Sequence, residues 1–355
     1  MGIVYNHEQL RTYMDEATKV SPDYPVYLDR FLEDAVELDL DCLCDGEQVY
    51  IGGILEHIEM SGIHSGDSAC CIPPFTLSAS LQERLRDIAR RLALRLGVCG
   101  LLNIQFAIKD QIIYVIEANP RASRTVPFVS KATGVPLAKI AARIMAGEKL
   151  ADLNLPPDDR TFDHFSAKEA VMPFGRFPGS DAVLGPEMKS TGEVMGIAEN
   201  FPAAYLKTQL AVGYEQPAGG MAFISVCDND KRAIGSIAHA IARLGFKLCA
   251  TSGTARTLRA VGLDCEEVCR VSATGSSKRN IMDLINEGKI NLIINTPSGD
   301  ETQSDGFILR TAAVAHGLTY MTTLAAAQAM AIGIEVASEQ GLRIVALQDL
   351  PQWEG

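Results

Sequence analysis

From Gly219 onward the sequence alternates short apolar runs with helix-like segments, and this alternation constrains the fold more than any other feature. The predicted strands are Met221–Val226, Lys247–Ala250, Glu266–Cys269, Leu292–Asn295 and Thr319–Met321. The helices predicted between and after them are Lys231–Leu244, Ala255–Val261, Ile281–Glu287, Phe307–His316 and Leu324–Ile332. This order is typical of a doubly wound parallel sheet, which binds ligands at the carboxyl ends of its strands. Residues 213–355 are therefore predicted to form one α/β domain.

The first 150 residues also alternate strand-like and helix-like segments. The predicted strands are Val26–Leu28, Glu37–Leu43, Val49–Glu56, Leu102–Ile108 and Ile112–Glu117. A helix is predicted over Leu81–Leu96, because its leucines and Ile88 recur at helical spacing and Gly97 ends it. The polar, proline-containing stretch from Asp152 to Asp163 is interpreted as a linker. Residues 151–212 are predicted to connect the two domains.

Composition excludes several classes of partner. The formal net charge of −12 argues against nucleic acid and anionic membranes, which attract an excess of Lys and Arg, whereas small nucleotides need only local charge. No apolar run approaches the roughly 20 residues of a membrane helix, and the first residues lack a secretory signal, so a cytoplasmic location is predicted. The nine cysteines form no C-x-x-C pair, which favours reduced core thiols over a zinc site.

A candidate metal site lies in two strands predicted to form a hairpin. Glu117 and Asn119 share one face of their strand because side chains alternate, and Gln105 lies near them on the other strand. One carboxylate and two carboxamide oxygens suit a hard cation such as Mg²⁺ that also binds nucleotide phosphates. Arg121 and Arg124 follow directly, where their forked donors can meet phosphate oxygens. The alternative is a polar hairpin edge that only faces solvent.

Two further segments have the composition of anion sites. The run from Ser61 to Ser68 contains two glycines, so its backbone N–H groups can approach a phosphate closely, although a plain surface turn has the same composition. Residues 251–254 (Thr-Ser-Gly-Thr) stand between a predicted strand and a helix N-terminus, where free N–H groups and the helix dipole favour an anion. An ordinary capped helix start is the alternative for this second segment.

Several motifs together resemble a known family. Glu117-Ala118-Asn119-Pro120-Arg121, with Gln105 upstream, resembles the metal-binding core of ATP-grasp enzymes. The runs Arg121–Ala138, His64–Ser68 and Leu184–Met195 resemble the large subunit of carbamoyl-phosphate synthetase, and the similarity extends over essentially the whole chain. The resemblance implies the C-terminal portion of that subunit: the later part of its second ATP-grasp domain, which has an α+β fold, followed by a methylglyoxal-synthase-like allosteric domain.

The resemblance also implies a reaction and its residues. In this family the second ATP-grasp unit phosphorylates carbamate with ATP and Mg²⁺ or Mn²⁺, which gives carbamoyl phosphate for arginine and pyrimidine biosynthesis. The implied metal positions are Gln105, Glu117 and Asn119, and the implied catalytic positions are Asn119, Arg121 and Arg124. The implied nucleotide-binding positions are Asp29, Leu32, Glu37, Gly62, Ile63, His64 and Ser65, together with Gln105 and Glu117.

Regulation is implied in the same way. The positions that match the family's site for a nucleoside monophosphate, UMP or IMP, are Lys231, Thr251, Ser252, Gly253, Thr254, Arg270 and Asn295. The positions that match its site for the cationic activator ornithine are Glu59, Asp67, Glu169, Tyr320 and Thr322. A ligand that touches both domains is a means of coupling them.

Two other functions were weighed. A free-standing enzyme of the methylglyoxal synthase type needs a carboxylate base and a histidine, and Lys278 and Thr302 stand at the matching positions, so that chemistry is not expected. A stand-alone nucleotide-binding regulatory module without catalysis remains open. The chain begins partway through the ATP-grasp fold, so alone it is expected to be incomplete and to need the rest of the large subunit. A glutaminase small subunit is an expected partner, mainly through the half that is not present. No Walker-type loop occurs, which excludes P-loop chemistry.

Overall fold

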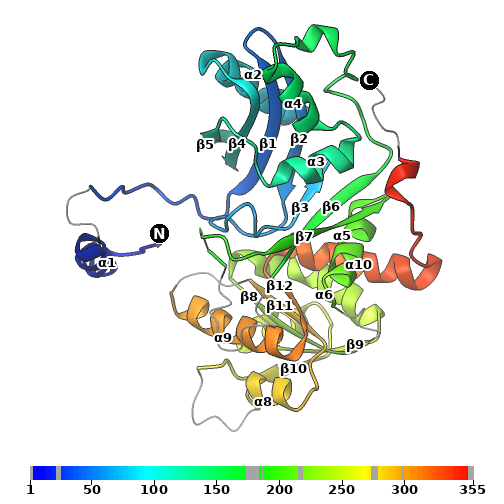
Figure 1. The fold of residues 1–355 in the computed structure, drawn as a ribbon. Coiled ribbons are helices and arrows are strands. Elements are labelled where there is room, and N and C mark those ends of the chain that lie inside the picture. The colour runs from blue at the N-terminus through cyan, green and yellow to red at the C-terminus, as the bar shows by residue number, and fades with distance from the viewer. Residues whose placement is uncertain are drawn as a thin grey trace.

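The computed structural model describes residues 3–20, 25–172, 184–185, 187–214, 219–272, 279–296 and 300–350, apart from the side chains of residues 20 and 300–304. It contains two β-sheets, which lie one above the other in Figure 1. Within these ranges, no helix combines the length and the apolar character that crossing a membrane requires.

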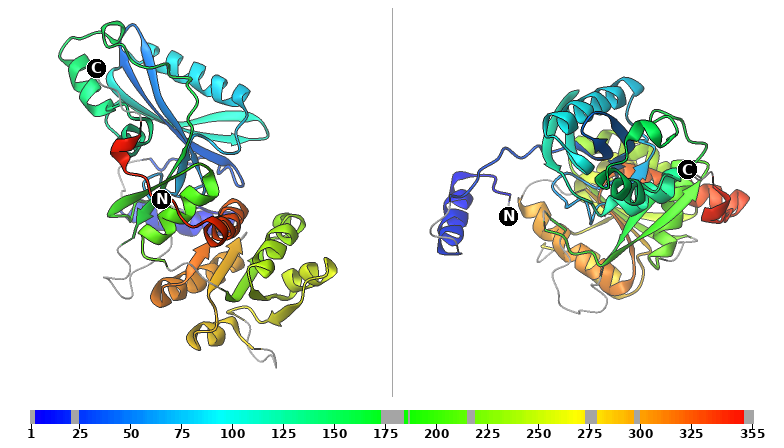
Figure 2. Two further views of the ribbon diagram at one scale, coloured as in Figure 1. Left: turned by 90° about the vertical axis from the view of Figure 1, so that its right-hand side faces the viewer. Right: turned by 45° about the horizontal axis from the view of Figure 1, so that its top comes forward.

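The first sheet has seven antiparallel strands in the order β5-β4-β1-β2-β3-β6-β7. The strands are β1 (Val36–Asp45), β2 (Val49–His57), β3 (Cys70–Ile72), β4 (Cys99–Lys109), β5 (Ile112–Asn119), β6 (Phe165–Val171) and β7 (Gly192–Ala198). Helices α2 (Ala79–Arg95), α3 (Thr125–Thr133) and α4 (Leu137–Met145) accompany it. Figure 2 shows α2 on one side of this sheet and the α3–α4 pair on the other.

The two faces of the first sheet differ because side chains alternate along each strand. Leu38, Leu40 and Cys42 of β1 pack with Leu85 and Ala89 of α2 in one apolar cluster. The residues between them, Glu37, Asp39 and Asp41, therefore point to the face that carries α3 and α4. This face is polar near its centre, and it holds the candidate metal residues.

The second sheet has five parallel strands in the order β10-β9-β8-β11-β12, which confirms the predicted doubly wound α/β fold. The strands are β8 (Gly220–Val226), β9 (Phe246–Thr251), β10 (Cys265–Val268), β11 (Leu292–Thr296) and β12 (Thr319–Met321). The helices are α6 (Ile234–Arg243), α7 (Ser252–Ala260), α8 (Ile281–Asn286) and α9 (Asp300–His316). Ala222 and Ile224 of β8 pack with α6 and α7, whereas Phe223 packs with α8 and α9, so helices cover both faces.

A layer of two helices joins the sheets. Helix α5 (Phe201–Ala211) packs on β6 and β7, and α10 (Leu324–Gln340) packs on α5 and α6. One apolar cluster contains Ile58, which follows β2, together with Ala167 of β6, Tyr205 of α5 and Met330 of α10. Because this core is continuous, the two sheets are held as neighbours. The boundaries at residues 150 and 212 stay predictions.

The close approach of α5 and α10 depends on Gly333. A Cβ atom at this position would lie 2.7 Å from the carbonyl oxygen of Pro202 and 3.0 Å from Cβ of Leu206. We expect Gly333→Ala to lower the free energy of unfolding by about 1–3 kcal/mol, because the added methyl pushes the helices apart. Urea unfolding measures this.

Gly235 in α6 provides the matched control, since a Cβ there would meet Val261 at an ordinary 3.5 Å. Gly235→Ala is expected to leave stability unchanged or to raise it slightly, because alanine favours a helix more than glycine does. Equal stability of the two variants would contradict the packing argument.

Several secondary-structure predictions need correction. Val26–Leu28 forms no strand: the segment is irregular, with Tyr27 89% exposed and Leu28 64% exposed, so its apolar character does not reflect burial. Helix α1 (His7–Val20) was not predicted, and it stands apart from both sheets in Figure 1. Also missed were α3, α4, α5, β3, β6 and β7. Short 3-10 helices cover Leu150–Asp152, Asn229–Arg232 and Leu347–Asp349.

Candidate functional site

The polar face of the first sheet is built by strand register. Asp39 pairs with Gln105, which pairs with Glu117, and these form one row across β1, β4 and β5. Asp41, Asn103 and Asn119 form the next row. Directly paired residues share a face. The predicted metal residues Gln105, Glu117 and Asn119 are thus brought together, as the hairpin pattern predicted.

These three residues make short side-chain contacts with one another and with the loop over residues 61–68. Asn119 Nδ2 donates to Glu117 Oε1 at 2.8 Å, and Gln105 Nε2 donates to Ser65 Oγ at 2.7 Å. In the described ranges, no cluster of three or more histidine, cysteine, aspartate or glutamate side chains is placed to hold a metal ion. One carboxylate with two carboxamides is instead an oxygen donor set of the kind Mg²⁺ shares with phosphates.

A buried ion pair lies beside this row. His57 Nε2 and Asp39 Oδ2 are 2.7 Å apart, and His57 Nδ1 lies 3.7 Å from Glu37 Oε2. Burial opposes protonation of His57, but its hydrogen bond to Asp39 and the nearby charges of Asp39 and Glu37 outweigh burial and raise the pKa of His57 to about 9. Burial likewise pushes the pKa of Asp39 up, and the contact with His57 more than offsets this, so the pKa is lowered. The pair is therefore charged at neutral pH.

Glu37 links the sheet to the glycine-containing loop over residues 61–68. Its Oε1 accepts a hydrogen bond from the Gly62 N–H at 2.9 Å. Gly62 has φ +89°, and a Cβ atom there would lie 2.9 Å from the ring of Phe31, so glycine is needed. Ser61 Oγ donates to the carbonyl of Leu32 at 3.1 Å. Leu32, Glu37 and Gly62 are thus neighbours, while Asp29 lies on an exposed stretch.

The remainder of this loop is held by buried charges. Lys168, which is 1% exposed, donates from Nζ to the carbonyls of Ser65 and Gly66 at 3.1 and 3.4 Å. Asp67 accepts from the backbone N–H groups of Lys189 and Ser190 at 2.7 and 2.8 Å. Both carboxylate oxygens of Asp67 therefore fix the loop to the segment before β7. Ile63 is buried, and the His64 N–H donates to the Gly185 carbonyl.

Arg121 and Arg124 lie on the loop between β5 and α3. Both are exposed. Arg121 Nη1 donates to the neighbouring Ala122 carbonyl at 3.2 Å, and Arg124 makes no side-chain cap at the start of α3. Among the described residues, neither arginine forms an ion pair. Both guanidinium groups are therefore available to an anion.

A second acidic cluster lies where the two sheets meet. Thr322 Oγ1 donates to Glu59 Oε2, and Thr323 Oγ1 donates to the Ile58 carbonyl at 2.8 Å. Glu169 Oε2 accepts from Gln209 Nε2 at 2.5 Å. Burial, reinforced by the charge of Glu59, raises the pKa of Glu169 to about 8. Glu59, Glu169 and Thr322 come from different elements, so the tertiary fold creates this cluster.

The parallel sheet has a pocket of about 200 Å³ at the carboxyl ends of its strands. It opens where β8 and β11 are neighbours, the point at which the strand order reverses and open α/β sheets bind ligands. The lining residues are Ser225, Val226, Cys227, Asp228, Lys231, Thr251, Gly253, Thr254, Arg270, Asn295 and Thr296. The pocket contains every position predicted for a nucleoside monophosphate except Ser252, the first residue of α7.

The electrostatics of this pocket favour an anion. A Cβ atom on Gly253 would lie 2.9 Å from Lys231 Nζ, so the ammonium group lies over the N-terminal turn of α7. The Lys231 ammonium and the positive N-terminal end of α7 repel each other. An anion bound between them would turn this repulsion into two attractive interactions. Lys231 is paired with Asp228, whose side chain is 91% exposed. Arg270 adds a second cation to the lining.

The pocket and the acidic cluster are connected. Asn295 Nδ2 donates to the Tyr320 hydroxyl at 2.8 Å, and the Arg310 guanidinium lies 5.5 Å from the centre of the Tyr320 ring. Tyr320 is the neighbour of Met321, which precedes Thr322. A hydrogen bond therefore runs from the pocket lining to the strand that contacts Glu59.

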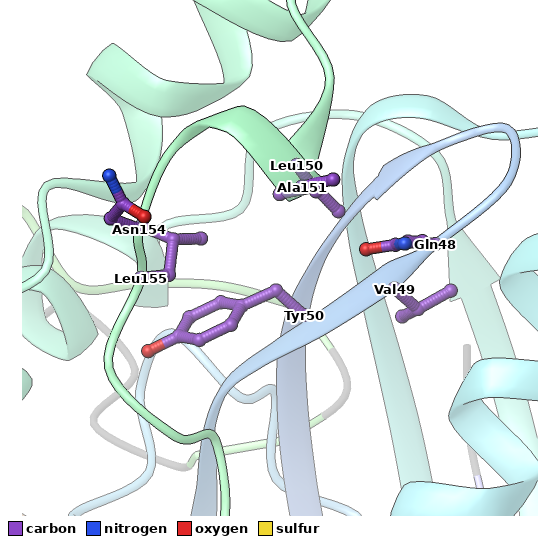
Figure 3. A pocket seen from close by; sticks show the side chains of 7 residues that line it. All are labelled: Gln48, Val49, Tyr50, Leu150, Ala151, Asn154 and Leu155. Atoms are coloured by element: carbon purple, nitrogen blue, oxygen red, sulfur yellow. The ribbon is translucent and has the colours of Figure 1, made fainter.

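A further pocket of about 260 Å³ lies at the turn end of the β1–β2 hairpin. Figure 3 shows its lining, in which the Tyr50 ring extends toward Leu155 and the Gln48 and Asn154 carboxamides lie at the rim. No predicted site residue lines it. Lys278, one of the two positions used to argue against methylglyoxal synthase chemistry, lies outside the described residues, as does the side chain of Thr302.

Sequence reasoning missed the buried polar residues beneath the candidate site: Asp39, Asp41, His57, Asn103 and Lys168, each less than 9% exposed. One signal was present, since acidic residues occupy every second position from Glu37 to Asp41 in an otherwise apolar strand. Charged side chains are rarely buried unless paired, so this alternation indicates partners on the same face.

Comparison with known proteins identifies the chain's class. Residues 1–153 match the family described as carbamoyl-phosphate synthase L chain, ATP binding domain, and residues 233–322 match the MGS-like domain family. The Methanobrevibacter smithii carbamoyl phosphate synthase large chain is 51% identical over 351 residues, which cover 98% of this chain and 33% of that protein. The Methanocaldococcus jannaschii carbamoyl phosphate synthase large chain, C-terminal section, is 48% identical over 359 residues, covering 99% and 58%.

The chain thus spans about a third of the first relative's length. Among solved structures, a biotin carboxylase domain of a thermophilic 2-oxoglutarate carboxylase has 20% sequence identity and a TM-score of 0.45, over 59% of this chain and 54% of that one. Two matched domains define this chain as an ATP-binding domain joined to an MGS-like domain. The chain belongs to the carbamoyl phosphate synthase large chain family, and it corresponds to the C-terminal part of that protein.

Proposed function

We propose that this chain is the part of a carbamoyl phosphate synthase that phosphorylates carbamate with ATP, and that its second domain senses a nucleotide. The observation that supports the catalytic proposal most strongly is the row of Gln105 and Glu117 with Asn119 beside it, followed by the exposed Arg121 and Arg124. The product would be carbamoyl phosphate, which feeds arginine and pyrimidine biosynthesis. A cytoplasmic location is part of the same proposal.

In this proposal each group has a defined task. Glu117, Gln105 and Asn119 would hold Mg²⁺ or Mn²⁺ through oxygen, and the metal supplies charge neutralisation at the phosphates. Arg121 and Arg124 would bind the transferred phosphoryl group, where fixed positive charge stabilises the transition state. Glu37 and the loop carrying Gly62, Ile63, His64 and Ser65 would bind the ribose and phosphates, with Asp29 and Leu32 near the base.

The regulatory proposal rests on the pocket at the carboxyl ends of β8, β9 and β11. Lys231, Arg270 and the N-terminus of α7 would bind the phosphate of UMP or IMP. Glu59 and Glu169 would bind a cation such as ornithine, with Tyr320 and Thr322 as neighbours. Both oxygens of Asp67 accept backbone hydrogen bonds, so Asp67 would act by holding the loop near that ligand.

Partners follow from the partial coverage of the relatives. The remainder of the large chain would complete the ATP site, and a glutaminase small subunit would be held mainly by that remainder. A stand-alone regulatory module without catalysis is the alternative, and it is favoured by one observation: the nucleotide pocket lies wholly within the parallel-sheet domain.

Calorimetric titration with MgADP tests the catalytic proposal. Glu117→Ala is expected to weaken MgADP binding at least 10-fold, because removing one metal-binding carboxylate removes a charge-assisted contact. Glu47→Ala is the matched control, since Glu47 lies in the same sheet domain, pairs with Lys149 and is not a proposed site residue. Unchanged MgADP affinity in Glu117→Ala would refute the metal assignment. Absence of MgADP binding by the unaltered chain, with UMP or IMP still bound, would favour the regulatory module.

A further inference from the structure

Asp41 is a buried carboxylate beneath the candidate active site that the proposed reaction does not use. It lies on β1 and is 0% exposed. Its Oδ1 accepts from Asn103 Nδ2 at 3.0 Å and from Ser123 Oγ at 2.8 Å, and its Oδ2 accepts from Thr125 Oγ1 at 2.5 Å. Three donors from β4 and from the start of α3 therefore converge on one carboxylate.

The sheet register shows what these contacts accomplish. The loop of residues 120–124 leaves the sheet at Asn119, the last residue of the edge strand β5. Asn119 pairs with Asn103, and Asn103 pairs with Asp41, so Asp41 lies two strands inward, roughly 10 Å away at the usual strand spacing. The loop therefore returns across β4, and Ser123 and Thr125 bind it to Asp41 through hydrogen bonds.

Asp41 also lies at the N-terminus of α3, where the helix has no side-chain cap. The N-cap residue of α3, Arg124, makes no side-chain hydrogen bond to the helix, although such caps normally satisfy the free N–H groups. Asp41 instead brings a negative charge to the N-terminus of this helix, where the macrodipole favours it. Thr125, which is 3% exposed, is the first residue of α3, and its hydroxyl links the helix to Asp41.

The two arginines depend on this anchor. Ser123 and Thr125 flank Arg124, and Ser123 is two residues after Arg121. The Arg121 N–H donates to the Asn119 carbonyl at 2.8 Å, so the loop is fixed at one end by β5 and at the other by Asp41. Neither exposed arginine side chain makes a described contact beyond its own loop. The loop ends therefore fix the backbone from which both arginine side chains extend.

From this geometry we infer that Asp41, acting through Ser123 and Thr125, is a positioning residue that fixes the loop carrying Arg121 and Arg124 over the metal-binding row. The inference rests on the proposed function, because it gives the arginines a phosphate to meet. Asp41 itself touches no substrate. It acts by removing freedom from the groups that do, and catalytic groups lose effect when they are misplaced by as little as about 1 Å.

The hydrogen bonding predicts which substitution preserves this anchor. Ser123 Oγ and Thr125 Oγ1 each contact Asp41, and they also lie 2.7 Å from each other, which makes three short contacts. The two hydroxyl groups have only two protons to donate, and an ionised Asp41 has none, so one of the three contacts lacks a proton. An amide at position 41 supplies the missing donor toward Thr125 and keeps an acceptor for Ser123. Asp41→Asn is therefore expected to retain the loop, whereas Asp41→Ala and Thr125→Val are expected to release it.

Two measurements on the full chain test the inference. The first is limited trypsin cleavage after Arg121 and Arg124, which reports loop order without any ligand. We expect cleavage of Thr125→Val to be about 10-fold faster, because this variant loses one hydrogen bond to a charged group and the loop opens more often. We expect Asp41→Asn to be cleaved at the rate of the unaltered chain. The second is binding of MgADP compared with adenosine. We expect Thr125→Val to weaken MgADP about 10-fold and to leave adenosine unchanged, since only the phosphates meet the arginines.

Thr133→Val is the matched control, because Thr133 is equally buried at the far end of α3 and donates to Val129 rather than to Asp41. A double-mutant cycle adds a stricter criterion: Thr125→Val should cost no further MgADP affinity once Arg121 and Arg124 are alanine. Three results would overturn the inference. Thr125→Val could weaken MgADP and adenosine equally, or weaken MgADP just as much when Arg121 and Arg124 are alanine. It could also be cleaved no faster than Thr133→Val.

Failure of the proposed function is distinguishable from failure of this inference. If the unaltered chain binds no MgADP, the proposed ATP site fails in this chain, and the trypsin measurement alone decides the role of Asp41. Faster cleavage in Thr125→Val and wild-type cleavage in Asp41→Asn would then still support the anchor. Unchanged cleavage in all variants would refute it, whatever the nucleotide binding shows.

Discussion

Replacing Lys231 with alanine is expected to weaken binding of UMP or IMP by about 10- to 100-fold, the usual cost of a lost charge-assisted contact to phosphate. The Lys231 ammonium lies over Gly253 at the N-terminus of α7, within the pocket at the carboxyl ends of β8, β9 and β11. Without it, Arg270 and the helix dipole remain to neutralise the phosphate among the described lining residues. Calorimetric titration of the variant with each monophosphate measures the effect.

Lys289→Ala is the matched control, because Lys289 pairs with Glu287 and does not line the pocket. Uridine, which lacks the phosphate, should bind equally well to both variants and to the unaltered chain. Equal loss of uridine and UMP in Lys231→Ala would mean that the substitution damaged the pocket as a whole. Undiminished UMP binding would contradict the phosphate assignment.

Binding of a cation such as ornithine between the two sheets is expected to strengthen as pH rises from about 6 to 8, by up to roughly 10-fold per pH unit. Burial and the charge of Glu59 raise the pKa of Glu169 to about 8, so Glu169 is largely protonated at pH 6 without a ligand. A bound cation requires the ionised form. Binding below the raised pKa must therefore release a proton, and the affinity should level off above pH 8.

Calorimetry in buffers of different ionisation enthalpy measures this proton release directly. Glu169→Gln should bind ornithine weakly and with little pH dependence. Glu193→Gln is a suitable control: Glu193 neighbours Ala170 across the β6–β7 ladder, whereas Glu169 pairs with Val194, so the two glutamates point to opposite faces. The assignment is wrong if ornithine binds to the unaltered chain with the same affinity at pH 6 and pH 8.

The parallel-sheet half of the fold was predictable because its elements are local and regular. Each predicted strand of three to six residues became a strand of similar extent, and predicted helices shifted mainly at their ends: α9 begins at Asp300 rather than at Phe307. The antiparallel half was harder. Val26–Leu28 has strand-like composition but pairs with nothing in the described structure, and β3 has only three residues, held by partners distant in the chain.

The candidate metal residues followed from sequence because a hairpin places residues 105 and 117 opposite each other after a short turn. Their roles, and those of the ornithine and nucleotide positions, stay predictions. The buried residues beneath them did not follow, because their partners are far away in the chain: Asp41 and Ser123 are 82 positions apart, and Lys168 contacts Ser65 from 103 positions away. No local pattern encodes such pairs.

The sequence by itself determined the alternation of buried and exposed positions, the parallel α/β domain, and the residue types of an oxygen-based metal site. These features are local, since they depend on side-chain period, on turns and on helix termini. Only the tertiary structure decided that Asp41 anchors the arginine loop, that Glu59 meets Thr322 between the sheets, and that Glu169 is buried enough to hold its proton near neutral pH. Those properties depend on which distant segments exclude water from a given group, and pairing and desolvation exist only once the chain has folded.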